Sequence, residues 1–243
     1  MRRRFQIIGL VLAVLGLVFL VAGGVAFAKS QEGYRSLEKF SAAQNVTLSY
    51  DEEGRLIDRG TPEGAQAILD MLRNEWGYPV NEAELDPADP LVNTPTEYMY
   101  QMATIVYHVR HGEQTVVLTE DVEYDGQVFP AGEYTITPIE VGSPERVAAG
   151  LGGYWTDFDR LHPIEGPARN QAWSGTVHGL VAELGVGTTT ATMVQLATAL
   201  AGAFAGMGLV SLVAGIGFLW VARGREETLV VIPTDTRPEP AGV

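Results

Sequence analysis

The stretch IIGLVLAVLGLVFLVAGGVAFA, residues 7–28, has 22 residues without a charged or strongly polar side chain, and an arginine triplet at residues 2–4 precedes it. A bilayer core of about 30 Å needs about 20 helical residues, so this stretch is long enough to span a membrane. The alternative is a cleaved signal peptide, because residues 26–28 read Ala-Phe-Ala. The apolar run is longer than the roughly 7–15 residues typical of a signal sequence, and we therefore predict a retained first span.

A second uncharged stretch lies near the other end of the chain, between Glu183 and Arg223. Its apolar part, residues 193–222, would form a helix longer than the bilayer core. We therefore predict that residues 199–221 occupy the membrane and that the threonine-rich turns before them stand above its outer surface. Trp220 has the position of an interfacial aromatic residue.

The arginines that flank both spans predict the orientation of the chain. Positively charged flanks stay in the cytoplasm, so both termini are expected there and residues 29–188 outside the cell membrane. Residues 29–188 carry 10 basic and 26 acidic side chains. Such an acidic segment is repelled by nucleic acid and by anionic lipid headgroups. The two spans make the lipid bilayer an expected partner, and a membrane-protein partner is expected as well.

Composition adds two points about the exported segment. The chain has no cysteine, and a domain of about 160 residues can bury an adequate core without disulfides. Of the 16 basic residues in the whole chain, only 2 are lysines. We interpret this as the codon usage of a GC-rich bacterial genome.

Local patterns in residues 29–188 predict mixed secondary structure. Residues 32–43 are expected to continue the first helix. Thr61 is expected to cap a helix whose apolar residues recur at three- and four-residue spacing, and residues 177–184 suit a short helix.

The centre of the exported segment reads as β-structure. Residues 103–110 and 114–119 are predicted as strands, Asp125-Gly126 as a hairpin turn, and residues 134–139 as a further strand. The expected sheet is an antiparallel β-meander of three to five strands.

These patterns predict a membrane protein with two transmembrane α-helices bracketing an extracytoplasmic α+β domain, made of a small antiparallel β-meander plus short helices. The expected divisions are the cytoplasmic arginines with the first span, the exported domain, the second span with its outer threonine-rich turns, and a disordered cytoplasmic tail. Their bounds are residues 1–28, 29–188, 189–222 and 223–243.

Few residues in the sequence suggest a catalytic or metal-binding role. His108 and His111 are three apart, so on a predicted strand they point to opposite faces and do not converge on a metal. Asp157, Asp159 and His162 are the best candidates for an acid or metal site, although the Gly and terminal Glu of a calcium loop are missing. No catalytic motif is present in the sequence, and we expect no cofactor.

The second span carries a more specific pattern of small residues. Small side chains spaced by four let helix backbones approach closely in lipid. The predicted packing residues are Ala197, Ala201, Gly202, Ala205 and Gly206. Gly9, Ala13 and Gly16 form a possible matching stripe in the first span, and another subunit is the alternative partner.

Three short sequences resemble a group of actinobacterial membrane proteins that have one helix at each end and an exported insert. They are Asn-Val-Thr at residues 45–47, Glu-Leu-Asp-Pro-Ala-Asp-Pro at residues 84–90 and Pro-Ala-Arg-Asn at residues 167–170. Proteins of this group are often labelled aromatic ring-opening dioxygenases. That activity implies an iron site, which the spacing of His108 and His111 does not supply, so the resemblance implies only the architecture.

We therefore expect a non-enzymatic integral membrane protein of the bacterial envelope, an accessory, assembly or scaffolding component of a larger complex. The absence of charge in either span argues against a transporter or proton path. The alternative is an exported enzyme or ligand-binding domain tethered by its two helices.

Overall fold

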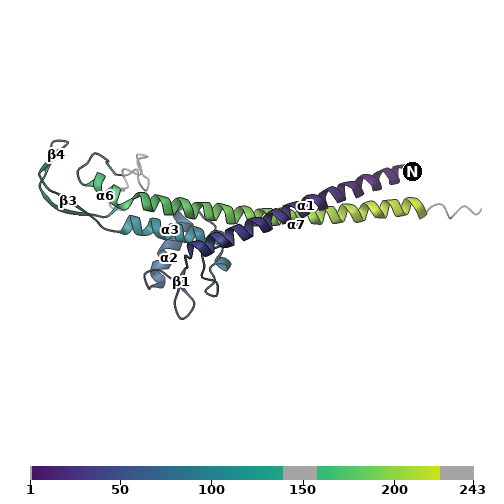
Figure 1. The fold of residues 1–243 in the computed structure, drawn as a ribbon, viewed down its shortest axis with the longest axis horizontal. Coiled ribbons are helices and arrows are strands. Elements are labelled where there is room, and N and C mark those ends of the chain that lie inside the picture. The colour runs from purple at the N-terminus through teal and green to yellow at the C-terminus, as the bar shows by residue number, and fades with distance from the viewer. Residues whose placement is uncertain (1, 139–157, 225–243) are drawn as a thin grey trace, which may run out of the picture. The chain divides into compact units, whose positions relative to one another are not determined.

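The computed structural model of the chain describes residues 2–138 and 158–224. The chain divides into two compact units: unit 1 combines Met1–Glu32 with Gln195–Val243, and unit 2 is Gly33–Val194. Helices α1 (Arg2–Gln44) and α7 (Gly175–Gly224) supply residues to both units (Figure 1). The other described helices and strands belong to unit 2.

Both α1 and α7 are long and apolar enough to cross a membrane. Only 11% of the most apolar window of each helix is buried, so neither is the enclosed core helix of a globular domain. The helical structure predicted for residues 32–43 and 177–184 is confirmed, because these residues belong to α1 and α7 respectively. The chain thus has two long apolar helices with a small antiparallel sheet region between them in the sequence.

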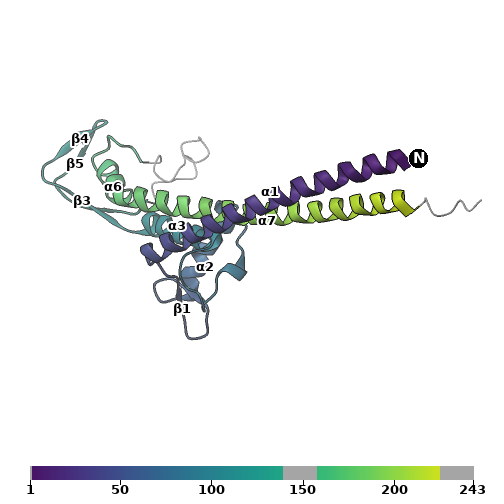
Figure 2. The same cartoon turned by 45° about the vertical axis from the view of Figure 1, so that its right-hand side comes forward.

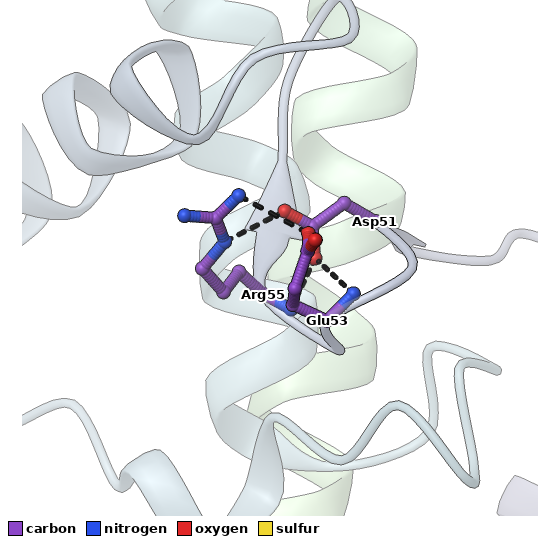
Figure 3. A network of polar contacts seen from close by, with 3 residues as sticks. All are labelled: Asp51, Glu53 and Arg55. Atoms are coloured by element: carbon purple, nitrogen blue, oxygen red, sulfur yellow. Dashed lines mark hydrogen bonds and ion pairs between the residues drawn. The ribbon is translucent and has the colours of Figure 1, made fainter.

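Unit 2 begins with a short hairpin of β1 (Ser49–Tyr50) and β2 (Leu56–Ile57). Asp51 closes its turn: one carboxylate oxygen accepts the Arg55 backbone N–H at 2.8 Å, and the other accepts the Arg55 Nε–H at 2.7 Å (Figure 3). A second exposed ion pair joins Arg55 to Glu53. The network gives these charged side chains a local role in shaping the turn.

Helix α2 (Pro62–Asp70) starts as the sequence predicts. The Thr61 hydroxyl accepts the Gly64 N–H at 3.1 Å, which satisfies one free donor of the first turn. The helix continues into a π-helical turn, η1 (Met71–Glu75), and Gly77 follows with φ 62°. Of the predicted apolar face, Ala65, Ile68, Met71 and Leu72 are buried in the core of unit 2, and Trp76 is partly buried against it. Leu69, which was not predicted, is buried as well.

After a 3-10 turn, η2 (Glu82–Glu84), the chain forms helix α3 (Pro95–His111), and the strand predicted for residues 103–110 is wrong. Thr94 and Glu97 form a reciprocal capping box that starts the helix. The helix then buries Tyr98, Ala103 and Val106 on one side, while the alternating pattern within residues 103–110 carries no sheet. Tertiary burial and the cap therefore override local strand propensity.

A long β-ribbon follows α3, shown with its tip beside α6 in Figure 2. β3 (Gln114–Leu118) pairs with β6 (Gly132–Ile136), and β4 (Val122–Tyr124) pairs with β5 (Gln127–Phe129), all antiparallel. The Asp125-Gly126 turn is confirmed, with φ of 47° and 74°. Four strands are present, but their nested pairing makes one ribbon and corrects the predicted meander, in which consecutive strands would pair.

The last helix before α7 is α6 (Glu165–Ala172). Its Ala168 and Ala172 are buried, as is the following Trp173, and all three belong to the core of unit 2. The predicted site residue Asp157 lies outside the described residues.

Candidate functional site

Asp159 and His162 lie together in the turn before α6, where the His162 N–H donates to the Asp159 carbonyl at 3.2 Å. The Asp159 carboxylate accepts the hydroxyl of Tyr124 at 2.6 Å and the N–H of Leu161 at 3.0 Å. The hydrogen bond from Tyr124, followed by that from Leu161, holds the pKa of Asp159 below its ordinary value. This carboxylate therefore fastens the tip of the β-ribbon to the turn before α6.

His162 acts as a cap for the same turn. Its Nδ1 accepts the backbone N–H groups of Ile164 and Glu165 at 3.1 and 3.2 Å. A ring nitrogen that accepts hydrogen bonds uses its lone pair for them. A metal-bound histidine instead coordinates through one nitrogen and donates from the other. In this geometry the Nδ1 lone pair of His162 is already used by two backbone N–H groups.

The imidazole of His162 also contacts the β-ribbon. The ring of Phe129 lies edge-on to it at a centroid distance of 4.8 Å, and that of Tyr124 at 5.4 Å. The Glu165 carboxylate accepts the Asp159 N–H at 2.7 Å, which completes the joint. Asp159 and His162, which the sequence suggested as candidate site residues, therefore connect the β-ribbon to the turn before α6.

The segment of His108 and His111 is helical, and each of the two imidazoles is bonded to a group of its own surroundings. His108 Nε2 lies 2.9 and 3.0 Å from the two carboxylate oxygens of Asp58. His111 uses Nδ1 to bond the Tyr107 carbonyl of its own helix at 2.8 Å. Within residues 2–138 and 158–224, no group of three or more His, Asp or Glu side chains is placed to hold a metal ion.

In unit 1, α1 and α7 run side by side in both views (Figures 1 and 2). Small residues recur every seven positions along each helix and are buried there. We call them the small-residue seam: Gly9, Gly16 and Gly23 of α1, with Ala201, Gly208, Gly215 and Ala222 of α7. A seven-residue repeat keeps one face of a helix turned towards its partner over many turns.

The seam brings the two backbones into contact. A Cβ atom added to Gly9 would lie 2.8 Å from the Gly215 carbonyl oxygen, and one added to Gly16 would lie 2.7 Å from that of Gly208. Gly23 similarly approaches Ala201, at 3.0 Å. The partners descend along α7 as they ascend along α1, so the helices are antiparallel. Two stacked aromatic pairs flank the seam, Phe5 with Phe218 and Phe19 with Phe204.

The predicted packing residues divide between two faces of α7. Ala201 is buried in the seam, and the Ala205 backbone nitrogen would lie 3.1 Å from a Cβ on Gly23. Ala197 is half-buried. Gly202 and Gly206 are exposed, and within the described part of the chain no atom lies within 4 Å of a Cβ placed on either.

Sequence reasoning by four-residue spacing missed most of the seam. Gly208, Gly215 and Ala222 of α7 and Gly23 of α1 were not singled out, although the first span was expected to offer Gly9 and Gly16. The available signal was the spacing of seven residues, which occurs in both apolar segments. A seven-residue search of the two segments together would have found it.

The described residues thus define two long apolar helices closed on each other by a small-residue seam, together with a small α+β unit. No protein-family model, curated protein or solved structure matches the chain.

Proposed function

We propose that the chain is a non-enzymatic, two-pass membrane protein of the bacterial envelope that acts as an accessory, assembly or scaffolding component of a larger complex. Its two helices anchor it in the cell membrane, with both termini in the cytoplasm and the acidic residues 29–188 outside. The small-residue seam is the observation that carries the proposal. It supports a permanently paired anchor in which both spans are retained.

The physical case starts from the different surfaces of the two helices in unit 1. Glycine and alanine line their facing sides where the backbones approach most closely, and such approach gains van der Waals contact, the main source of helix association in lipid. Their outer sides are apolar: Leu10, Leu17 and Val21 of α1 and Leu209 and Val210 of α7 are each more than half exposed. Water would oppose this exposure, whereas lipid chains would cover it without cost.

The same contacts support retention of the first span. Cleavage after residue 28 would remove Gly9, Gly16 and Gly23 and leave the backbone face of α7 without its partner. The seam therefore supports an anchor over a signal peptide. The intact mass of the purified protein tests this point directly.

Two surfaces remain for protein contacts under this proposal. One is the face of α7 that carries Gly202 and Gly206, where the described chain leaves room for close approach by another helix. The other is the acidic exported unit, whose charge suits a basic partner surface. The geometry of His162 disfavours the alternative of a metal enzyme, because its Nδ1 is already occupied.

The experiment is extraction of tagged full-length protein from native membranes in a mild detergent, followed by identification of the proteins that co-purify. We expect a defined membrane protein at fixed stoichiometry. Gly202→Leu should reduce its recovery, whereas Gly24→Leu, at an equally open position of α1, should not. Migration of the wild-type chain as a lone monomer under several mild detergents would contradict the proposal.

A further inference from the structure

A shallow groove of about 310 Å³ lies on unit 1 where α1 begins and α7 ends. Its lining is apolar and comes from both helices: Phe5, Ala214, Gly217, Phe218, Trp220 and Val221. Gly217 keeps it open, because nothing in the described chain lies within 4 Å of a Cβ placed there. Trp220 is 75% exposed beside it.

Exposed arginines lie at the same end of the two helices. Phe5 and Phe218 stack with ring centroids 5.9 Å apart, which aligns the start of α1 with the end of α7. Arg3 and Arg4 come just before Phe5, and Arg223 lies two residues after Val221. At 1.5 Å rise per residue, these side chains reach the level of the groove mouth.

We infer that this groove binds one anionic glycerophospholipid, with an acyl chain along the apolar lining and the phosphate-bearing headgroup on Arg3, Arg4 and Arg223. An apolar channel next to a cluster of cations matches the two ends of such a lipid, and basic sites between membrane helices bind anionic headgroups. The arginine guanidinium also suits phosphate geometry. The exposed indole of Trp220 lies where tryptophan contacts the interfacial region of lipid.

The inference rests on the proposed membrane placement but not on the proposed partner complex. Unlike a bulk lipid contact, it requires that headgroup charge and groove shape both matter. A lipid held only by the apolar surface would be retained whatever its headgroup. A lipid held only by charge would not respond to filling the groove.

Native mass spectrometry of the detergent-purified full-length protein separates these cases. The probes are dioleoyl-phosphatidylglycerol and dioleoyl-phosphatidylcholine, which share acyl chains and differ in headgroup charge. We expect one phosphatidylglycerol to be retained with roughly tenfold preference over phosphatidylcholine. The triple variant Arg3→Gln, Arg4→Gln, Arg223→Gln should abolish the preference, and Gly217→Leu should lower retention of both lipids.

The matched control is Gly206→Leu, which adds the same side chain at another open position of α7 outside the groove. It should leave lipid retention unchanged while testing the proposed helix partner. Equal retention of the two lipids by the wild-type protein, or unchanged retention in Gly217→Leu, would overturn the inference.

A second measurement keeps the test decisive if Gly217→Leu does not fold. Brominated phosphatidylglycerol in mixed micelles should quench tryptophan fluorescence more strongly than brominated phosphatidylcholine, and Trp220→Phe should remove the difference. The absence of any headgroup dependence would refute the site. Loss of the lipid site would leave membrane insertion and co-purification intact, whereas failure of the proposed complex would leave lipid binding intact.

Discussion

At the residue scale, His162 joins two elements of unit 2 through its imidazole ring. Nδ1 holds two backbone N–H groups of the turn before α6, and the ring contacts Phe129 and Tyr124 of the β-ribbon. His162→Ala should therefore destabilise the protein by about 1 kcal/mol, the typical net contribution of an intramolecular hydrogen bond. Thermal unfolding of the full-length protein in detergent, followed by near-ultraviolet circular dichroism, measures this loss.

Two variants sharpen that measurement. His162→Asn keeps a side-chain acceptor suited to a helix N-terminus and should recover part of the stability. His111→Ala removes an exposed histidine whose bond is to its own helix, and its effect should be smaller. Equal stability of the His162→Ala and wild-type proteins would mean that the cap contributes nothing.

Glu97 gives unit 2 a specific pH dependence. Its side chain is only 1% exposed, and burial raises the pKa of its carboxyl, although the N–H groups of Asn93 and Thr94 donate to it. A carboxyl whose folded pKa exceeds its unfolded value of about 4.3 stabilises the fold fully below that value. This contribution is lost as the pH rises through the folded pKa, because the buried group must then ionise.

The variant Glu97→Gln tests the direction of this pH dependence of stability. Glutamine keeps the capping geometry but does not ionise, so the variant should gain stability relative to wild type between pH 4 and pH 7. Unfolding of both proteins in the same detergent at the two pH values isolates this group, because the other titrating groups are shared. A stability difference that is the same at both pH values, or that favours wild type at pH 7, would contradict the assignment.

At the element scale, the local signals that succeeded were those with a backbone mechanism. The Thr61 cap and the Asp125-Gly126 turn were predictable because each satisfies a local conformational demand. The strand prediction for residues 103–110 was wrong because their alternating pattern competes with a helix that Thr94 and Glu97 start nine residues earlier. The capping sequence was available, but its weight against strand propensity depends on burial, which is tertiary information.

The small-residue seam also depends on tertiary information, in this case between elements that are distant in the sequence. The glycines of both spans are visible in the sequence, but which of them face each other depends on the antiparallel register of two segments far apart along the chain. The site candidates were harder still, because Asp159 and His162 have the residue types of a ligand set and serve as structural joints. Only the hydrogen-bond directions distinguish the two roles.

The seam predicts an asymmetric response to leucine along α1. Gly16→Leu places atoms where the Gly208 carbonyl and the Leu212 amide already lie, 2.7 and 2.6 Å from the added Cβ. Backbone atoms cannot move aside without separating the helices, so we expect a loss of roughly 1–3 kcal/mol or more. Thermal unfolding in detergent measures it.

Gly24→Leu is the matched control, since it adds the same side chain to the same helix where nothing in the described chain lies within 4 Å. Helix propensity favours leucine over glycine equally at both sites. A similar change in stability for the two variants would show that the seam does not hold α1 against α7.

At the scale of the whole molecule, the charge distribution and the paired spans together predict the topology. Residues 29–188 carry the excess of acidic side chains, while an arginine triplet precedes the first apolar segment and Arg223 and Arg225 follow the second. The chain has no cysteine, so single cysteines report location without interference. In intact cells a membrane-impermeant maleimide should label Glu52→Cys, in the β1–β2 turn, and spare Ala241→Cys, in the C-terminal tail, until the membrane is permeabilised.

Labelling of both cysteines before permeabilisation would place the C-terminus outside. Because an antiparallel pair brings both chain ends to one side of a bilayer, Arg4→Cys must behave as Ala241→Cys does, and a difference between them would mean that only one helix spans the membrane.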